Sequence, residues 1–271
     1  MEKRGFGEVE TWIFDLDNTL YPASCRLFDQ IDLRMGTFIA ELLGVDRAAA
    51  KAVQKDYFYR YGTTLRGLML EHDVPPDAFL DYVHDIDHSP IPADEALARA
   101  LEALPGRKLI FTNGTVAHAE KVLARLGVGG HFTGIFDIVH SEFIPKPQLE
   151  PYEKFVAVHA IEPQRAAMFE DIARNLEIPH RLGMTTVLVT CPDNADSNLL
   201  NAQAGSTMHH VDHVTDDLAG FLSHIEGASA GDQEQRRKAR GAASAQDSAV
   251  EAGQGCAASV TPRLKHNRPA E

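Results

Sequence analysis

Strand-like and helix-like segments alternate along the second half of the chain, and this alternation constrains the fold more than any other feature. Short apolar or β-branched runs are followed by amphipathic helical stretches that end at glycine, such as the one from Val116 to Gly127. The predicted strands cover residues 108–112, 134–139, 166–170, 185–190 and 208–211. Because strands joined through helices run parallel and are covered on both faces, we predict an α/β fold built on a parallel sheet.

A further strand is predicted near the amino terminus, where the apolar run of residues 12–14 ends in two aspartates. Asp15 and Asp17 are one residue apart, so an extended backbone points both side chains the same way. A buried strand has no structural reason to end in acids, because an unpaired buried carboxylate is costly. Ligands of α/β sheets bind at the carboxyl ends of strands, so the pair is expected to face a ligand. The structural alternative is an Asx turn with solvated acids.

The segment between this strand and the next is predicted to be helical. Apolar residues recur at spacings of three and four from Leu27 to Leu43, and further helices are expected at 47–59, 65–71 and 76–83. Prolines at positions 90, 92 and 105 mark the end of the segment. We therefore predict a small all-helical domain at 22–104, inserted after the first strand into a core made of residues 8–21 and 105–226.

The acidic charge of the chain belongs to this body and not to the tail at 227–271. The formal net charge is −13, whereas the tail carries seven basic and five acidic residues. An acidic body is a poor surface for nucleic acid, so no nucleic-acid partner is expected. The tail is rich in alanine, glycine, serine and glutamine and contains no aromatic residue. We predict that it is disordered, because it cannot bury enough apolar surface to fold.

Cysteine usage and hydropathy favour a cytoplasmic protein. Cys25, Cys191 and Cys256 are far apart and lack CxxC spacing, which is typical of reduced thiols. No apolar run approaches the roughly 20 residues needed to span a membrane. The first residues also lack the apolar segment of a signal peptide. No membrane association is expected, and the sequence leaves the oligomeric state open.

Polar groups of complementary chemistry follow two more strands. The segment 112–114 contains a hydroxyl, an amide and a glycine, and Glu170 and Asp171 end the strand at 166–170. Lys146 lies between two prolines. Because strand ends of a parallel sheet share one edge, these groups are expected to meet the two amino-terminal aspartates. Carboxylates suit a hard cation, and the donors suit phosphate oxygens, so the set fits phosphoryl transfer.

These elements resemble the motifs of the haloacid dehalogenase-like phosphatase superfamily. The matching segments, in the family's order and spacing, are 15–19 (Asp-Leu-Asp-Asn-Thr), 112–113, Lys146 and 170–171. The resemblance covers about residues 10–226 and implies a Rossmann-like core, with the helical insert as the family's small cap domain. Many relatives have Gly-Asp or Asp-Asp where this chain has Glu170-Asp171, which leaves the role of Glu170 the least defined.

The resemblance implies three catalytic residues. Asp15 would be the nucleophile that forms a phosphoaspartate. Asp17 would protonate the leaving oxygen and then activate the water that hydrolyses the intermediate. Lys146 would neutralise charge on Asp15 and on the phosphoryl group.

The same resemblance implies a cofactor and a set of binding residues. The cofactor would be Mg2+, held by Asp15, Asp171 and the backbone carbonyl of Asp17, with Glu170 in support. The phosphoryl oxygens of a small phosphate monoester would be bound by Thr112 and Asn113, with Gly114 allowing close approach of the backbone.

Segments 18–22, 59–67 and 82–87 resemble the pyrimidine 5′-nucleotidase branch of the family. This resemblance implies hydrolysis of pyrimidine nucleoside 5′-monophosphates such as UMP and CMP. Rings and polar groups of residues 57–67 suit a base and its contacts, although Tyr57 and Phe58 also suit a helical core. The residues assigned to substrate binding in this segment are Tyr61, Thr63, Thr64 and Arg66.

Other functions stay open at the level of sequence. A phosphatase of a sugar phosphate or phosphoglycolate, or a phosphosugar mutase, would use the same motifs. Asp17 argues against dehalogenation, because relatives that cleave carbon–halogen bonds need no acid–base partner there. A non-catalytic regulator that binds a partner is disfavoured by the intact motifs. His84 and His88 have the spacing of a transition-metal pair, but a solvated or capping role is expected.

Overall fold

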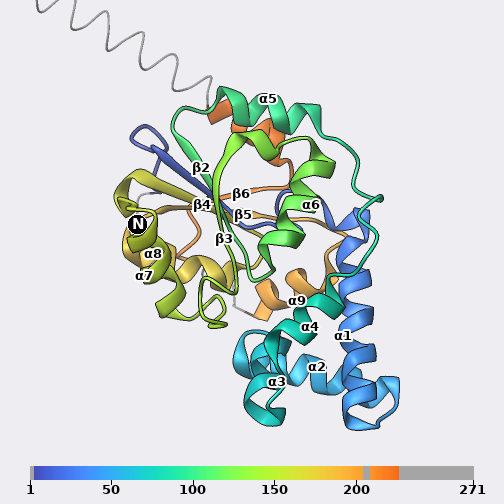
Figure 1. The fold of residues 1–271 in the computed structure, drawn as a ribbon. Coiled ribbons are helices and arrows are strands. Elements are labelled where there is room, and N and C mark those ends of the chain that lie inside the picture. Colours follow the sequence, from blue (N-terminus) through green and yellow to red (C-terminus); the bar gives the residue numbers. More distant parts are fainter. Residues whose placement is uncertain (1–2, 204–207, 226–271) are drawn as a thin grey trace, which may run out of the picture. The chain divides into compact units, whose positions relative to one another are not determined.

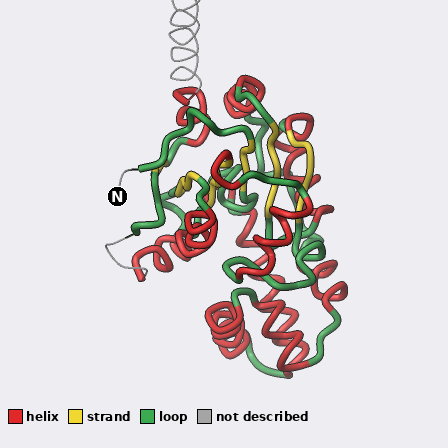
Figure 2. The backbone as a smooth tube through the Cα atoms, turned by 90° about the vertical axis from the view of Figure 1, so that its left-hand side faces the viewer, coloured by secondary structure: helices red, strands yellow, loops and turns green. Residues whose placement is uncertain are grey.

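A computed structural model of the chain describes residues 3–203 and 208–225. Its six strands all pair in parallel, in the order β3-β2-β1-β4-β5-β6 (Figures 1 and 2). The predicted parallel α/β fold is confirmed. The strands are β1 (Thr11–Phe14), β2 (Arg107–Phe111), β3 (Phe132–Phe136), β4 (Ala166–Glu170), β5 (Thr185–Val189) and β6 (His213–Thr215). The order switches direction at β1, and the crevice at such a switch is where open α/β sheets bind ligands.

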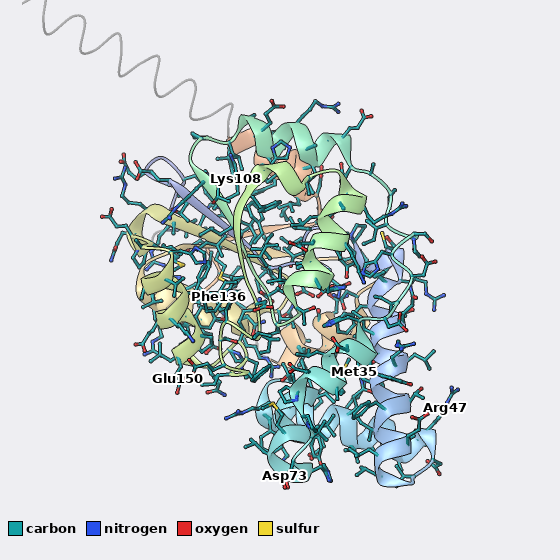
Figure 3. All side chains as sticks on the ribbon, in the orientation of Figure 1. Met35, Arg47, Asp73, Lys108, Phe136 and Glu150 are labelled. Atoms are coloured by element: carbon teal, nitrogen blue, oxygen red, sulfur yellow. The ribbon has the colours of Figure 1, made fainter. Side chains whose placement is uncertain are left out.

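Successive strand residues pack on opposite faces of the sheet, as the two-residue period requires. Trp12 and Phe14 join one apolar cluster with α5 (Glu95–Ala103), α6 (Val116–Leu126) and a helix at 218–225. Ile13 joins the opposite cluster with α7 (Leu149–Val158) and α8 (Glu177–Leu182). Side chains fill the layers on both faces (Figure 3). The sheet is thus a rigid support for the residues that follow its strands.

The segment between β1 and the α5 helix contains the expected helical insert. Its elements are η1 (Ala23–Cys25), α1 (Leu27–Leu43), α2 (Arg47–Tyr61), α3 (Thr64–His72) and α4 (Pro76–Val83). They bury Ile39, Leu68 and Phe79 in an apolar cluster of their own. The α5 helix instead buries Leu97 and Leu101 against the sheet. The domain boundaries at 21/22 and 104/105 stay predictions.

Local capping explains where several helices begin. The Asp46 carboxylate accepts from the backbone N–H of Ala49 at the start of α2, and Asp94 does the same for Leu97 in α5. Thr115 caps α6 through the N–H of His118. This last cap fixes the first turn of α6 directly after the end of β2, next to the strand-end residues.

Two segments near the carboxyl end differ from the predictions. The last strand is β6, not 208–211, because Met208 and Val211 close a turn through a 3.0 Å backbone hydrogen bond. The helix α9 (Ala195–Gln203) is not among the predicted helices, because its residues show no clear apolar period. The tail at 227–271, with its predicted disorder, lies outside the described residues. Within the described ranges, no helix combines the length and apolarity needed to cross a membrane.

Candidate active site

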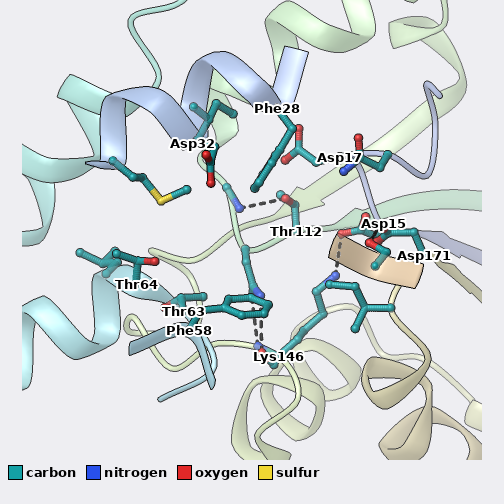
Figure 4. A pocket seen from close by; sticks show the side chains of 18 of the residues that line it. Asp15, Asp17, Phe28, Asp32, Phe58, Thr63, Thr64, Thr112, Lys146 and Asp171 are labelled. Carbon is teal, nitrogen blue, oxygen red and sulfur yellow. Dashed lines mark hydrogen bonds and ion pairs between the residues drawn. The ribbon is translucent and has the colours of Figure 1, made fainter. Parts of the chain in front are cut away.

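The polar residues predicted at the strand ends meet at one edge of the sheet. Asp15 and Asp17 follow β1, Thr112 follows β2, and Asp171 follows β4. They line a cavity of about 390 Å3, to which α1, α2 and α4 contribute the opposite wall (Figure 4). Helices of the insert and strands of the sheet therefore enclose one site between them.

The ammonium group of Lys146 joins two acids at the centre of this site. Lys146 is 2% exposed, and its Nζ donates to Asp15 Oδ1 at 2.7 Å, to Glu170 Oε2 at 2.8 Å and to the Phe111 carbonyl at 2.9 Å. Burial lowers the pKa of Lys146, but the two carboxylates outweigh it and raise the pKa above its usual value. The lysine is therefore a fixed cation, and Glu170 is its partner.

Asp15, Glu170 and Asp171 form a buried acidic cluster that suits a divalent cation. One carboxylate oxygen of each lies within 4.8 Å of the others. Burial, with the charge of Glu170, raises the pKa of Asp15 to about 7 even beside Lys146. Burial, together with the charges of Glu170 and Asp15, raises the pKa of Asp171. Three acids beside one lysine leave excess negative charge, and an all-oxygen donor set is what Mg2+ prefers, so these residues fit the expected cofactor.

The carboxylate of Asp171 is held by residues that the sequence analysis missed. Asn194 Nδ2 and Ser197 Oγ both donate to Asp171 Oδ2, at 2.9 and 2.6 Å. Both donors lie in or just before α9, the helix that the sequence pattern did not reveal. Asn175 Nδ2 donates to Glu170 Oε1 at 2.8 Å, which agrees with a positioning role. Hydrogen bonds thus orient the acids of the cluster before any ligand arrives.

Asp17 points away from this cluster toward a different set of partners. Its Oδ1 accepts from Tyr21 Oη at 2.5 Å and lies 2.9 Å from His118 Nε2. Burial would raise the pKa of Asp17, but His118, Tyr21 and His84 together hold it at about 2. The backbone carbonyl of Asp17 as a metal ligand stays a prediction.

His118 is a residue that the sequence analysis missed, and it is 1% exposed. The sequence signal that could have indicated His118 is a lone imidazole on the apolar, buried face of α6, in register with Val122 and Leu126. His118 lies 101 residues from Asp17 in the chain, so no local pattern pairs the two.

His84 and His88 pack around His118 and are not solvated, whereas the expected capping role is confirmed for His84, which is the C-cap residue of α4. The ring of His84 stacks on His118 with centroids 4.7 Å apart, and His88 Nε2 lies 3.2 Å from His118 Nδ1. Burial, and then the charge of His118, lowers the pKa of His84 to about 4 and also lowers that of His88. Among the described residues, the acidic cluster is the group whose ligand atoms lie close enough together to hold a metal ion, and these histidines are not part of it.

Thr112, Asn113 and Gly114, which are predicted to bind phosphoryl oxygens, line the same cavity as Lys146. Thr112 Oγ1 accepts from the backbone N–H of Gly114 at 2.9 Å, which leaves the hydroxyl proton free to donate. The side-chain oxygen Oδ1 of Asn113 accepts from the backbone N–H of Lys146 at 3.0 Å and so fixes the loop that carries the lysine. A Cβ on Gly114 would lie 3.3 Å from Thr112 Oγ1, so a side chain would crowd this wall.

Only two of the four substrate residues predicted on the insert line the cavity in the described structure. Thr63 and Thr64 do so, although Thr63 caps α3 and Thr64 Oγ1 donates to the Gln54 carbonyl at 3.2 Å. Tyr61 and Arg66 are absent from the lining. The Tyr61 hydroxyl instead donates to Glu71 on the exposed side of α2 and α3. Phe58 and Tyr59 of the same helix line the cavity instead.

Comparison with known proteins places these motifs in a family. The model of the haloacid dehalogenase-like hydrolases matches residues 9–183. Phosphate metabolism protein 8 of Saccharomyces cerevisiae is 29% identical over 161 residues, which are 53% of this chain and 50% of the yeast protein. The chain thus spans half the length of that relative.

Two solved structures share the fold. A predicted phosphoglycolate phosphatase of Haemophilus somnus aligns with a TM-score of 0.54 and 17% identity, over 80% of this chain and 98% of that one. A haloacid dehalogenase-like hydrolase of Streptococcus pneumoniae aligns with a TM-score of 0.52 and 15% identity, over 80% and 99%. Both similarities concern the fold alone.

Proposed function

Because the chain belongs to the haloacid dehalogenase-like hydrolases, we propose that it is a magnesium-dependent phosphomonoesterase that works through a phosphoaspartate. The observation that carries the proposal is the ion-pair centre in which Lys146 joins Asp15 and Glu170, with Asp171 beside them. A nucleophilic carboxylate, a fixed cation and further oxygen ligands are what transfer of a phosphoryl group requires.

Asp15 is the nucleophile in this proposal. Its Oδ1 accepts from Lys146 and its Oδ2 accepts from Thr19 Oγ1 at 2.9 Å, so the carboxylate has a fixed orientation. One oxygen attacks phosphorus, and the bond between phosphorus and the ester oxygen breaks. Water then attacks the phosphorus of the phosphoaspartate, which releases phosphate and restores Asp15.

Asp17 handles the protons of both steps. In the first step a proton carried by the Asp17–His118 pair, whose Oδ1 and Nε2 lie 2.9 Å apart, passes through Asp17 to the leaving ester oxygen. In the second step Asp17 takes a proton from the attacking water. Its contacts with His118 and Tyr21 hold the carboxylate in place between these events. The presence of this acid also disfavours a dehalogenase, which has no leaving oxygen to protonate.

The remaining residues of the site neutralise the negative charge of the phosphoryl group. The hydroxyl of Thr112 and the ammonium group of Lys146 are donors for the equatorial phosphoryl oxygens. Asp15, Asp171 and the Asp17 carbonyl would hold Mg2+, with Glu170 nearby, and the ion supplies further neutralisation of phosphoryl charge. Charge stabilisation of this kind is the main contribution that such sites make to phosphoryl transfer.

The substrates that we propose are pyrimidine nucleoside 5′-monophosphates. Phe28 of α1 and Phe58 of α2 line the cavity and reach toward the strand-end groups (Figure 4). Flat apolar rings beside a phosphoryl site suit the base of a nucleotide better than the small polar leaving group of phosphoglycolate. The support from sequence is the resemblance of segments 18–22, 59–67 and 82–87 to pyrimidine 5′-nucleotidases.

The test is phosphate release from UMP, CMP, dTMP, AMP, GMP, phosphoglycolate and glucose phosphates, with Mg2+ and again with EDTA. We expect magnesium-dependent release, with UMP and CMP preferred. Release confined to phosphoglycolate or a sugar phosphate would keep the chemistry and overturn the nucleotide assignment. A mutase would convert a sugar phosphate with little net release, and no turnover of any ester would favour a partner-binding regulator.

A further inference from the structure

A row of hydrogen bonds leads away from Asp17 through two buried histidines. His118 Nε2 lies 2.9 Å from Asp17 Oδ1, and His118 Nδ1 lies 3.2 Å from His88 Nε2. His88 Nδ1 in turn lies 3.1 Å from the carbonyl oxygen of Ile86. His118 is 1% exposed and His88 is 9% exposed. The row therefore connects the proposed general acid with the backbone of the segment that joins α4 to α5.

The Ile86 carbonyl determines where the hydrogens of this row lie. A carbonyl oxygen only accepts, so His88 Nδ1 carries a hydrogen and donates it. Burial, and then the charge of His118, lowers the pKa of His88, which favours the neutral form of its ring. In a neutral ring with a hydrogen on Nδ1, the other nitrogen is an acceptor. His118 Nδ1 faces that acceptor, so it carries a hydrogen and donates it to His88 Nε2.

One further proton then belongs to the contact between His118 and Asp17. With a hydrogen on Nδ1, a neutral His118 turns the lone pair of Nε2 toward the carboxylate, which has no hydrogen to donate when it is ionised. The 2.9 Å contact therefore requires one proton between Nε2 and Oδ1. In the proposed mechanism this proton passes through Asp17 to the leaving ester oxygen, and the proton taken from water in the second step replaces it. The protons of the site thus balance over one turnover.

We propose that His88 is a positioning residue, whose Nε2 accepts from His118 Nδ1–H and thereby keeps a proton between His118 and Asp17 for the leaving group. This inference rests on the proposed function and adds a residue that touches neither the substrate nor the general acid. Without an acceptor at that position, His118 can carry its hydrogen on Nε2 alone. The pair then has a hydrogen bond but no proton to give.

Two further contacts hold these histidines in place. The ring of His84 lies against the face of His118, with centroids 4.7 Å apart and an angle of 16° between the planes. The Gln30 amide of α1 accepts from the backbone N–H of Asp87 at 3.1 Å and donates to its carbonyl at 2.8 Å. The backbone next to His88 is therefore fixed to the insert, and His118 has little freedom to turn.

The experiment compares an alkyl phosphate, the one that the wild type hydrolyses fastest, with p-nitrophenyl phosphate, both with Mg2+. An alkyl ester oxygen needs a proton to leave, whereas p-nitrophenolate does not. His88→Phe keeps a ring and removes the acceptor, and we expect it to lower kcat for the alkyl ester by about 10-fold or more and kcat for p-nitrophenyl phosphate much less. His88→Gln places an amide oxygen near the position of Nε2 and should recover most of the loss. Ser89→Ala, at an exposed position of the same segment, is the control and should match the wild type.

A second measurement locates the hydrogens in the wild-type protein and needs no turnover. Nitrogen-15 NMR of the histidine side chains distinguishes a ring nitrogen that carries a hydrogen from one that does not. We expect a hydrogen on Nδ1 of both His88 and His118, with the signals assigned by their loss in His88→Phe and His118→Phe. A His118 Nδ1 without a hydrogen overturns the inference.

The outcomes separate this inference from the function on which it rests. Equal losses on both substrates in a His88→Phe variant with the unfolding temperature of the wild type overturn the role of His88 and leave the phosphatase intact. A loss on the alkyl ester that His88→Gln does not recover also overturns that role. A wild-type protein that hydrolyses neither p-nitrophenyl phosphate nor any alkyl phosphate overturns the proposed function and this inference together.

Discussion

Lys146 neutralises part of the negative charge of the buried carboxylates in the site, so its removal should destabilise the protein. The size of this loss should depend on pH and on magnesium. The substitution Lys146→Met keeps most of the side-chain volume and deletes the ammonium group. That group donates to Asp15, Glu170 and the Phe111 carbonyl, all within 2.9 Å. Without it, three buried carboxylates whose oxygens lie within 4.8 Å of one another have no lysine beside them.

The expected cost follows from the burial of these groups. Breaking a buried ion pair by removing one partner costs about 3–5 kcal/mol, because the remaining charge is neither solvated nor paired. At pH 8 without metal, we expect the free energy of unfolding of Lys146→Met to be lower than that of the wild type by about this amount. Added Mg2+ should recover part of the loss at pH 8, since the cation replaces the missing positive charge.

The sign of the pH dependence follows from the pKa of Asp15. Folding raises it from 3.8 to about 7, so this carboxyl stabilises the folded state fully below pH 3.8 and loses that contribution as the pH rises to about 7. Loss of Lys146 removes an effect that lowers this pKa and so raises it further. The acids of the variant can therefore take up protons at pH 5, and the destabilisation should be smaller there than at pH 8.

Urea denaturation at pH 5 and pH 8, with EDTA or Mg2+, measures these differences. The control is Lys154→Met, which removes an exposed ion pair between Lys154 and Glu142 on the surface. It should behave as the wild type under all four conditions, because exposed pairs contribute little. Equal stability of Lys146→Met and Lys154→Met at pH 8 in EDTA would refute the account of a buried, charge-balanced centre.

Four further predictions concern turnover and magnesium binding. Asp15→Asn should abolish phosphate release, and near-normal hydrolysis would remove Asp15 as the nucleophile. Asp171→Ala should raise the Mg2+ concentration needed for half-maximal rate, and an unchanged requirement would exclude it from the ligand set. The apparent affinity for Mg2+, titrated by its effect on the unfolding temperature, should fall as the pH drops below about 7, because protons compete for Asp15 and Asp171. His118→Phe should lower kcat for a nucleotide by about 10-fold or more and change kcat for p-nitrophenyl phosphate much less, since p-nitrophenolate leaves without a proton. Equal losses on both substrates would show that His118 does not act through Asp17.

Much of the fold is visible in the sequence because its signals are local. The strand at 166–170 and the helices at 116–126 and 76–83 match the structure residue for residue. The two helices have a clear apolar period and a Gly or Pro at one end, and the strand is a short apolar run that ends in acids. The last strand and α9 cannot be predicted from such local signals, because β6 has three residues and α9 lacks a clear apolar face. Short and weakly amphipathic elements are decided by tertiary packing, which a single sequence does not display.

The strand-end residues of the candidate site are predictable for a similar reason. Parallel strands share one edge, so the acids at 15, 17 and 171 had to lie at the same edge of the sheet once the topology was fixed. The contacts that tune them are not predictable in this way. His118 reaches Asp17 across 101 residues, and Ser197 reaches Asp171 across 26. Such pairs depend on how helices pack around the cavity, and no spacing in the chain encodes that.

The central claim is that Asp15 carries the phosphoryl group between two steps. The most direct measurement mixes the Asp17→Asn variant with p-nitrophenyl phosphate and Mg2+, quenches in acid and locates the phosphoryl group by peptide mass spectrometry. The leaving group needs no proton, so the first step proceeds, whereas the second lacks its base and the intermediate accumulates. We expect the phosphoryl group on Asp15, with a burst of p-nitrophenolate that approaches one equivalent of the enzyme. Release of p-nitrophenolate with no phosphoryl group on Asp15 would contradict the account.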